Sequence, residues 1–421
     1  MDYQEAVNVL FTKLPMFQRS GPAAYKADLD GTLAVCEFLD NPENGLKFIH
    51  VAGTNGKGTV CHMISATLQE SGYKVGLFTS PHLLDFRERI RVNGEMVGEG
   101  VVVDFVEEFS GSWGTPSFFE LTFGMAMRYF ADSEVDVVIL ETGMGGRLDS
   151  TNIIPTAEVC VITNIGLDHQ NFLGDTIRDI SVEKAGIIKD GVPVVLGRMR
   201  AEAQSVIMAQ ALRQSCETHY GRTYAFAVGG EGTGINGPFF KENAATAFAT
   251  LEVLKSGGWV IPEDVIEDAL NNFKEISGQK GRFTFLPESS ELSTALLDCA
   301  HNIDGMKGLM GYLGQSDSEL HIIYGTVGDK DPSAVLDLIP SNSVMYWCEA
   351  DVPRSMEVEV LKGIGERVGL TGEAYGSVNS ALMAARRFAH GKEGVRVVVC
   401  GSVYVVGEVV EGGSYINEQS M

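Results

Sequence analysis

The stretch HVAGTNGKGTV, residues 50–60, places a lysine and two glycine turns at the end of a short apolar run. It nearly matches the P-loop pattern G-x-x-x-x-G-K-[ST], but Gly58 separates Lys57 from Thr59. Backbone N–H groups of a glycine turn can wrap an anion, and a helix that begins near Gly58 adds its positive dipole end. We interpret the loop as a phosphate site in which Lys57 supplies a charge and Thr59 can reach magnesium.

Apolar, strand-like runs alternate with helical patterns along most of the chain, which is typical of a parallel α/β sheet. The first part contains the runs KFIHVAG, KVGLFTS, VDVVILE, AEVCVIT and VPVVLG. After a polar stretch at residues 274–283 the alternation resumes with TALLDCA, ELHIIYGTV, SVMYWCEA and VRVVVCGSVYVVG. Because 421 residues exceed what one core usually supports, we predict two domains, 1–278 and a smaller α/β domain at 279–421.

The composition argues against several classes of protein. A net charge of -24 disfavours non-specific nucleic-acid binding, which needs a basic face. The longest apolar runs, such as VDVVIL, are far shorter than the ~20 residues of a membrane span. The N-terminus has no basic-then-apolar signal pattern, and the seven cysteines include no C-x-x-C pair. We expect a cytoplasmic protein with free thiols that binds neither a membrane nor nucleic acid.

Four polar loops each follow one of the predicted strands: GTNGKGT, TSPH, ETGMGGR and NIGLDH. The carboxyl ends of parallel strands lie along one edge of a sheet, where ligands bind. Glu141 directly follows an apolar strand, where nucleotide-hydrolysing folds place an acid that helps hold magnesium, and we interpret it as a metal ligand. His169 is equally compatible with a ligand and with an ordinary histidine, because magnesium prefers oxygen ligands.

The local sequence pattern assigns no function to Lys184 or to a cluster of three arginines. Lys184 lies near the end of a short predicted helix, where a solvated lysine is the default expectation. Arg87, Arg89 and Arg91 alternate in DFRERIRVNG. They fit an anionic substrate site and the exposed side of an edge strand equally well.

Taken together, these loops resemble the folylpolyglutamate synthase/dihydrofolate synthase family, of the bifunctional bacterial type, within the Mur ligase superfamily. The resemblance runs from about residue 21 to residue 408 and rests on HVAGTNGKGT, TSPHLLDFRERIRVNG, FFELTF, ETGMGGRLDSTN, DH, EKAGI, ENAATA, GRF, DCAHN and GSVYVVGEV. In this superfamily a glycine between the lysine and the serine or threonine is the normal P-loop. The implied fold is a P-loop-type, mainly parallel sheet domain followed by a smaller Rossmann-like α/β domain.

The resemblance also implies roles for individual residues. The implied catalytic residues are Lys57, Glu141, His169 and Lys184, the last carbamylated by carbon dioxide into a carboxylate-like group that helps position a second metal. The implied ligands of two magnesium sites are Thr59, Ser80, Glu141 and His169. The implied ATP contacts are Gly53, Thr54, Asn55, Gly56, Lys57, Gly58, Thr59, Asn243, Arg282, Asp298 and His301.

The implied reaction joins L-glutamate to dihydropteroate or to the glutamyl tail of reduced folates, with ATP and magnesium as cofactors. The implied substrate pocket comprises His82, Ser117, Phe118, Phe119, Glu120, Leu148, Asp149 and Ser150. We expect a monomer, and a need for a monovalent cation is left open. The chain departs from the family pattern in DCAHNI, where DGAHNP is commoner, and in SGQKGRF, which lacks the proline often found before GRF.

Three alternatives differ in substrate or class. A Mur-type ligase acting on a nucleotide-linked muropeptide would carry a sizeable domain before the P-loop, whereas only about 50 residues precede it here. A folylpolyglutamate synthase without dihydropteroate activity is harder to separate by sequence. A nucleotide switch without ligase chemistry is disfavoured by Glu141, His169 and Lys184, since a simple binder needs no second metal site.

Overall fold

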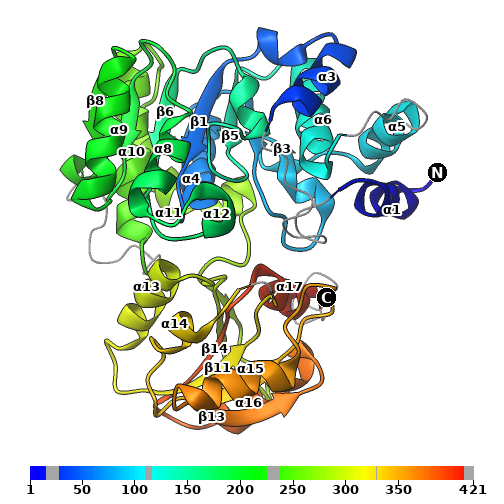
Figure 1. Ribbon diagram of the computed structural model, residues 1–421, viewed down its shortest axis with the longest axis vertical. Helices are drawn as coiled ribbons and strands as arrows, with labels where there is room; N and C mark the ends of the chain where they lie inside the picture. The colour runs from blue at the N-terminus through cyan, green and yellow to red at the C-terminus, as the bar shows by residue number, and fades with distance from the viewer. Residues whose placement is uncertain (16–27, 110–115, 225–236, 329, 412–421) are drawn as a thin grey trace. The chain divides into compact units, whose positions relative to one another are not determined.

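The computed structural model describes residues 1–15, 28–109, 116–224, 237–328 and 330–411, so the start of the resemblance near residue 21 and the end of the second predicted domain at 412–421 lie outside the described residues. The chain divides into two compact units, Met1–Gln279 and Lys280–Met421. Each unit contains one sheet covered by helices on both faces (Figure 1).

The first unit is built on an eight-stranded sheet in the order β4-β3-β2-β5-β1-β6-β7-β8. The strands from β2 to β8 in this order are parallel, and β3 and β4 are added antiparallel at one edge. Their bounds are β1 Phe48–Ala52, β2 Val75–Phe78, β3 Ile90–Val92, β4 Glu95–Met96, β5 Val137–Glu141, β6 Val159–Ile162, β7 Val194–Leu196 and β8 Thr218–Tyr220. The predicted mainly parallel α/β sheet is confirmed.

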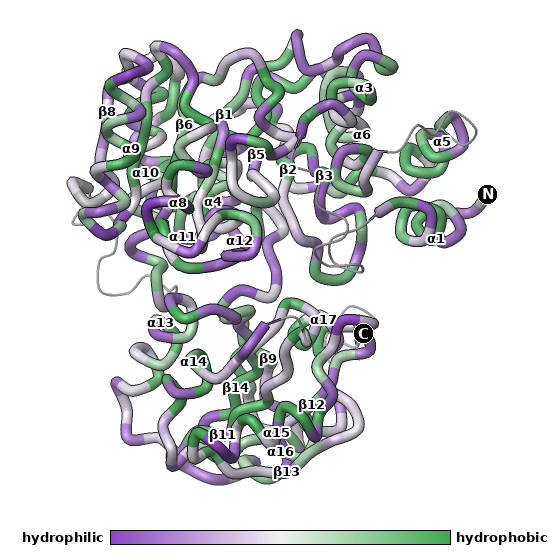
Figure 2. Tube along the Cα trace, viewed as in Figure 1, coloured by the Kyte–Doolittle hydropathy of each residue, from purple (hydrophilic) through white to green (hydrophobic). Residues whose placement is uncertain are grey.

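Side chains of a strand alternate between the two faces of a sheet. Ile49 and Val51 of β1 therefore pack into one apolar cluster, and Phe48 and Ala52 pack into the other. Figure 2 shows the hydrophobic residues that run along these central strands. The first cluster includes residues of α4 Lys57–Glu70, α10 Phe240–Ser256, α11 Glu263–Asn271 and α12 Phe273–Ser277; the second includes residues of α1 Tyr3–Lys13, α3 Asp30–Phe38, α5 Glu99–Phe109, α6 Phe118–Asp132, α8 Ile177–Ala185 and α9 Ala201–Arg213.

Short helical turns complete the first unit and lie in its loops. They are η2 Pro42–Gly45, η3 Phe86–Arg89, η4 Ser150–Ile153, α7 Gln170–Leu173 and η5 Gly221–Tyr224. Helix α4, which follows the P-loop, ends just before Gly72, because Gly72 adopts a left-handed φ of 89° and the Tyr73 N–H donates to the carbonyl of Leu68.

The second unit contains a six-stranded sheet in the order β13-β12-β11-β14-β10-β9, with only β9 antiparallel. Helices α13, α14 and α15 contribute to the apolar cluster on one face, and α16 and α17 pack against the strands separately from it. The bounds are β9 Thr284–Leu286, β10 Ala295–Leu297, β11 Glu319–Tyr324, β12 Val344–Cys348, β13 Thr371–Tyr375, β14 Val395–Cys400, α13 Ile303–Leu313, α14 Ser333–Leu336, α15 Val358–Arg367, α16 Val378–Ala389 and α17 Val403–Glu411.

One apolar run differs from its sequence interpretation. The stretch VRVVVCGSVYVVG reads as continuous strand, but β14 ends at Cys400 and α17 begins at Val403. Gly401 adopts a left-handed φ of 104°, and the Ser402 hydroxyl accepts a hydrogen bond from the Tyr404 N–H at 3.1 Å. An apolar run by itself does not distinguish a buried strand from a buried helix. Here the turn at Gly401 ends the strand and lets the helix begin.

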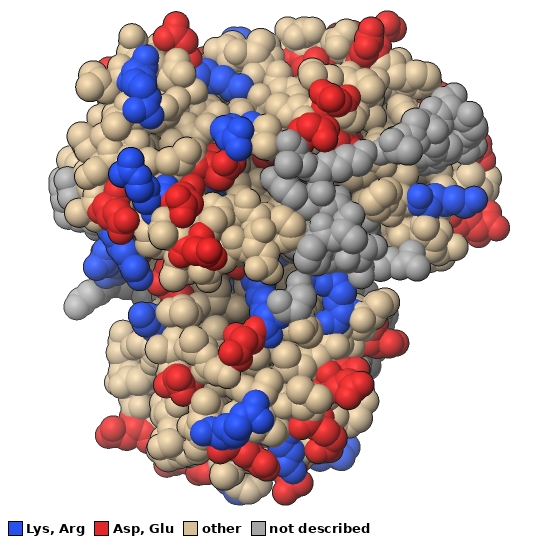
Figure 3. Space-filling model, in the orientation of Figure 1, with Lys and Arg blue, Asp and Glu red and all other residues tan. Residues whose placement is uncertain are grey.

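No helix among the described residues has both the length and the apolar character needed to cross a membrane. On the face shown in Figure 3, acidic and basic side chains are interspersed over both units.

Candidate active site

The P-loop is held in place by the loop that follows β6, the neighbour of β1 in the sheet. The Thr54 N–H donates to the carbonyl of Asn164 at 2.9 Å, and the Asn55 N–H donates to its side-chain Oδ1 at 2.7 Å. The Thr163 hydroxyl donates to the Asn55 carbonyl at 2.7 Å. These hydrogen bonds fix the backbone conformation of the loop before any ligand binds, which lowers the conformational-entropy cost of binding a phosphate.

Two glycines of this loop have no room for a side chain. Gly53 has a φ of 151°, and a Cβ there would lie 1.9 Å from the Thr163 hydroxyl oxygen. Gly56 has a φ of 82°, and a Cβ would lie 2.3 Å from Oδ1 of Asn243 on α10. Gly56 also precedes α4, so the N-terminus of that helix opens directly onto the loop. The geometry is that of an anion site.

We predict that Gly53→Ala weakens ATP binding about 5- to 150-fold, because either the loop or Thr163 must move and such backbone strain costs of order 1–3 kcal/mol. Isothermal titration calorimetry with ATP and magnesium measures this. Gly191→Ala is the matched control, because Gly191 also has a positive φ, 70°, but a Cβ there meets nothing within 4 Å. Equal ATP affinities of the two variants would contradict the assigned role of Gly53.

Two lysine ammonium groups share one carbonyl oxygen of the P-loop. Lys57 Nζ donates to the carbonyls of Gly53 at 3.2 Å and Thr54 at 3.4 Å, and Lys184 Nζ donates to the Gly53 carbonyl at 2.7 Å. Lys184 is 4% exposed, so the default expectation of a solvated lysine is wrong. Helix α8 carries it inward because Ile177, Ile180 and Ala185 of the same helix pack into the core.

Burial lowers the pKa of Lys184 to about 7, with the nearby positive charge of Lys57 as the second cause. Asp168 and Asp149 act in the opposite direction. An amine with a pKa near neutrality is a nucleophile under physiological conditions, whereas an ordinary lysine is an ammonium without a free electron pair. The lowered pKa is compatible with the carbamylation that the family resemblance implies, and the modification of Lys184 stays a prediction.

Oxygen donors gather next to the P-loop. Glu141, at the end of β5, is buried, and its Oε2 accepts a hydrogen bond from the Ser80 N–H at 2.9 Å. A Cβ on Gly58 would lie 3.4 Å from the same oxygen, which places the carboxylate beside the first turn of α4. Thr59 follows in that turn, and its hydroxyl lies 3.5 Å from Nε2 of Gln279.

A carboxylate beside threonine and serine fits magnesium, which prefers oxygen ligands. Among the described residues there is no group of three or more His, Cys, Asp or Glu side chains that could hold a metal. The predicted set contains only two such side chains, Glu141 and His169, so substrate phosphates and water would supply further ligands. His169 precedes α7 with a left-handed φ of 51°, and its N–H donates to Oδ1 of Asp168 at 2.9 Å.

The predicted substrate residues near α6 have structural partners. Ser117 and Glu120 form a capping box at the start of that helix, and Glu120 is buried. Phe118 packs beneath the Arg89 guanidinium at 5.1 Å, and the ring of Phe119 covers Gly143, where a Cβ would lie 2.6 Å from it. Their contact with a substrate stays a prediction.

The loop after β5 contains the other predicted substrate residues. Asp149 is buried and accepts hydrogen bonds from the N–H groups of Met144 at 2.8 Å and Thr151 at 3.1 Å. Ser150 is also buried and accepts a bond from the Thr32 hydroxyl at 2.9 Å, whereas Leu148 is half-buried. This loop lies on the same sheet edge as the P-loop because β5 pairs with β1.

The arginine cluster does not form an exposed face of an edge strand. Arg89 and Arg91 are buried, and β3 lies between β2 and β4. Arg89 Nε donates to Nδ1 of His82 at 2.7 Å, and Arg91 donates to the Gly94 carbonyl at 2.8 Å. Arg87 pairs with Asp85 at 2.7 Å. The edge-strand interpretation is therefore wrong, because β4 adds a further strand outside β3.

The remaining predicted nucleotide contacts lie in the second unit. Asp298 follows β10, and its carboxylate accepts hydrogen bonds from the N–H groups of Phe283 at 3.1 Å and Ala300 at 2.9 Å. His301 Nδ1 lies 2.9 Å from the Cys299 carbonyl. These bonds tie the GRF and DCAHN segments together within that unit, and the roles of Arg282, Asp298 and His301 toward a nucleotide stay predictions.

The chain has clear relatives of known name. The Mur ligase middle domain family matches residues 51–223. The dihydrofolate synthase/folylpolyglutamate synthase of Escherichia coli is 35% identical over 378 residues, which cover 86% of this chain and 85% of that protein. The chain belongs to the folylpolyglutamate synthase/dihydrofolate synthase family. A Haloferax volcanii protein named "Probable bifunctional folylpolyglutamate synthase/dihydropteroate synthase" is 32% identical over 97% of this chain, which spans about half, 50%, of that longer protein.

Solved structures of family members agree with the fold. Escherichia coli FolC in complex with DHPP and ADP matches with a TM-score of 0.80 and 29% identity, covering 98% of this chain and 97% of that chain. A bifunctional folylpolyglutamate synthase/dihydrofolate synthase with Mn, AMPPNP and L-glutamate bound matches with a TM-score of 0.79 and 27% identity, covering 98% of both chains. The predicted Mur ligase fold and the predicted enzyme class, an ATP-dependent ligase, are confirmed.

Sequence reasoning missed the residues that hold the P-loop in this family member. Thr163 and Asn164 form that support, yet only His169 was singled out from the loop after β6. The signal was the short side chains TN directly after an apolar strand, a place where side chains often bond to backbone.

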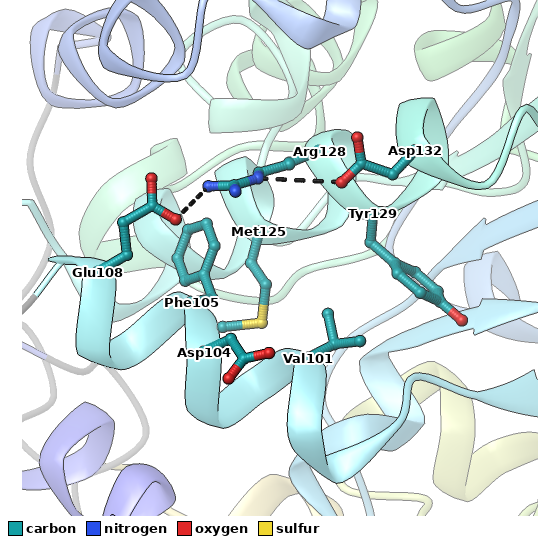
Figure 4. Close-up of a pocket in the computed structure, with 8 residues that line it drawn as sticks. All are labelled: Val101, Asp104, Phe105, Glu108, Met125, Arg128, Tyr129 and Asp132. Atoms are coloured by element: carbon teal, nitrogen blue, oxygen red, sulfur yellow. Dashed lines mark hydrogen bonds and ion pairs between the residues drawn. The ribbon is translucent and has the colours of Figure 1, made fainter.

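A groove on the surface lies away from these residues. It has a volume of about 200 Å³ and runs between α5 and α6 (Figure 4). The Arg128 guanidinium forms ion pairs with the carboxylate of Glu108, at an N–O distance of 2.6 Å, and with that of Asp132, at 3.9 Å. The other lining residues are Val101, Asp104, Phe105, Met125 and Tyr129, so no predicted site residue lines it.

Proposed function

We propose that the chain joins L-glutamate to the carboxylate of dihydropteroate and to the glutamyl tail of reduced folates, using ATP and releasing ADP and phosphate. The names of its relatives and the ligands DHPP, ADP, AMPPNP, Mn and L-glutamate in the related structures support this reaction. The observation that carries the proposal is the arrangement around the P-loop. Lys57 and Lys184 both donate to the Gly53 carbonyl, and the buried carboxylate of Glu141 lies beside the first turn of α4.

A carboxylate is a poor acyl donor because its negative charge repels an attacking amine and oxide is a very poor leaving group. The acceptor carboxylate oxygen therefore attacks the γ-phosphorus of ATP, ADP leaves, and an acyl phosphate forms. The free amine of glutamate then attacks the acyl carbon, phosphate departs with the bonding electrons, and the amine loses a proton. Each step moves negative charge onto phosphate oxygens.

The residues supply charge neutralisation and positioning, on which phosphoryl transfer chiefly depends. Lys57 and the N–H groups of the P-loop would contact the transferred phosphoryl group. Thr59, Ser80, Glu141 and His169 would hold magnesium. A bound magnesium ion would neutralise the phosphate charge, and a carbamylated Lys184 would add a further oxygen ligand. A second magnesium site, a monovalent cation, a cytoplasmic location and a monomeric state stay predictions.

The deciding experiment is a phosphate-release assay with ATP, magnesium, L-glutamate and one acceptor at a time. Dihydropteroate and a tetrahydrofolate are each expected to stimulate release, with mass spectrometry showing one added glutamyl residue. Stimulation by the tetrahydrofolate alone would identify a folylpolyglutamate synthase without dihydropteroate activity. If ATP binds but neither pterin acceptor gains glutamate, the proposal fails in favour of another amino-acid ligase.

A further inference from the structure

His50 is a polar residue at the centre of an otherwise apolar strand. It is fully buried in β1, between Leu140 of β5 and Cys160 of β6, and two residues before the P-loop strand ends at Ala52. Burying a polar ring costs free energy unless it is hydrogen-bonded. Burial lowers the pKa of His50 to about 3, with Lys189 as the second cause, so its imidazole is neutral at physiological pH.

One hydrogen-bond chain connects this ring to the loop after β5. His50 Nε2 lies 2.9 Å from the Thr151 hydroxyl oxygen, and that hydroxyl donates to Oδ1 of Asp149 at 2.6 Å. A hydroxyl has one proton, and Thr151 gives it to the carboxylate. His50 Nε2 must therefore carry the proton of the first bond. The ring is then the Nε2–H tautomer, and its Nδ1, which has no hydrogen-bond partner among the described residues, is a bare acceptor.

The carboxylate at the end of the chain connects two parts of its loop. Oδ1 of Asp149 accepts from both the N–H and the hydroxyl of Thr151, and Oδ2 accepts from the N–H of Met144. It thereby ties the glycine turn directly after β5 to η4. Without the Thr151 hydroxyl, the carboxylate would lose its 2.6 Å hydrogen bond, and the His50 ring would lose its one hydrogen-bond partner among the described residues.

We propose that His50, acting through Thr151, is a positioning residue. It holds Asp149 and the loop after β5 at a fixed place relative to the P-loop. This inference rests on the proposed function. β1 carries the P-loop at its end and His50 in its middle, so one strand locates both the phosphate and the loop predicted to contact the pterin acceptor. A misplacement of about 1 Å between reacting groups can cost on the order of 100-fold in rate, so such a connection matters for catalysis.

Thr151→Val tests the hydrogen-bond chain, because valine keeps the shape of threonine and removes the hydroxyl. The KM for the pterin acceptor is expected to rise about tenfold, which corresponds to about 1.4 kcal/mol, while the KM for ATP stays within about twofold. Thr151→Ser keeps a hydroxyl and is expected to restore most of the acceptor affinity. Equal changes in both KM values, or no change in either, would overturn the proposal, since a merely structural role would not select the acceptor.

His50 itself is tested by Gln and Leu replacements, because the glutamine amide can donate from near the place of Nε2 and leucine cannot. His50→Gln is expected to keep an acceptor KM within about threefold of the parent, and His50→Leu is expected to match Thr151→Val. Identical KM values for the two variants would contradict a donor role.

A measurement without turnover separates this inference from the proposed function. Nuclear magnetic resonance of the ¹⁵N-histidine-labelled protein is expected to show His50 as a neutral Nε2–H tautomer at pH 7, with a slowly exchanging ring proton that exchanges faster in Thr151→Val. An Nδ1–H tautomer would overturn the hydrogen-bond chain. If no pterin acceptor gains glutamate but this signal is present, the proposed function is wrong and the hydrogen-bond chain from His50 to Asp149 is still supported.

Discussion

Lys57→Ala is expected to lower acceptor-dependent phosphate release by about a thousandfold. The Lys57 ammonium lies beside the P-loop, 3.2 Å from the Gly53 carbonyl oxygen, and we predict that it contacts the phosphates of a bound nucleotide. Charge that develops on the transferred phosphoryl group would lose a preorganised cation, and such losses typically cost 10² to 10³ or more in rate. The effect should fall mainly on kcat, measured by steady-state phosphate release at saturating ATP.

Lys255→Ala serves as the control for Lys57. Lys255 lies on α10 of the same unit and forms a surface ion pair with Glu252 at 2.9 Å, so its loss should leave turnover unchanged. A Lys57→Ala enzyme that keeps more than about a tenth of the parent kcat would contradict the assigned role of the P-loop lysine.

Lys184→Ala is expected to lower turnover by at least about 100-fold, and added carbonate is not expected to rescue it. The parent enzyme should respond to bicarbonate in a pH-dependent way. Below pH 7 Lys184 is mostly an ammonium ion, which cannot attack carbon dioxide; above pH 7 it is mostly a free amine, which can. Activation by bicarbonate is therefore expected to rise through about pH 7, measured on enzyme first depleted of carbon dioxide.

Lys184→Arg separates a carbamate from a simple positive charge. Arginine keeps the charge and a donor for the Gly53 carbonyl, but its guanidinium does not deprotonate in proteins and forms no carbamate. We expect it to be as inactive as Lys184→Ala, and ¹³C resonance from labelled carbon dioxide should appear only in the parent. An active Lys184→Arg enzyme would rule out the carbamate as an essential group.

The convergence of the four polar loops followed from sequence alone. In a parallel sheet, strand direction places every strand's carboxyl end at one edge, so knowing which loop follows which strand is enough. The structure agrees, since Thr54 bonds to the loop after β6 and Ser80 bonds to Glu141. The functional roles of these residues stay predictions that the experiments above test.

Burial and partner choice did not follow from local sequence. Lys184 reads as a solvated lysine within its helix, yet it reaches the Gly53 carbonyl, 131 residues earlier in the chain. Arg89 and Arg91 read as a strand edge, yet β4 covers that edge. The partner of Lys184 is distant in sequence, whereas β4 follows β3 after only two residues. In both cases the neighbour lies in another element, and periodicity within one element carries no information about it.

The sequence by itself determined the α/β class, the P-loop and the family, because these depend on residue order within short segments and on strand direction. Only the tertiary structure decided that two lysines share the Gly53 carbonyl and that His50 reaches Asp149 through Thr151. The contacts of Lys184 with Gly53 and of His50 with Thr151 join residues 131 and 101 positions apart, and they form only where β1 lies between β5 and β6. Low dielectric inside that packing then sets the charge states, such as the lowered pKa of Lys184, that give the residues their chemistry.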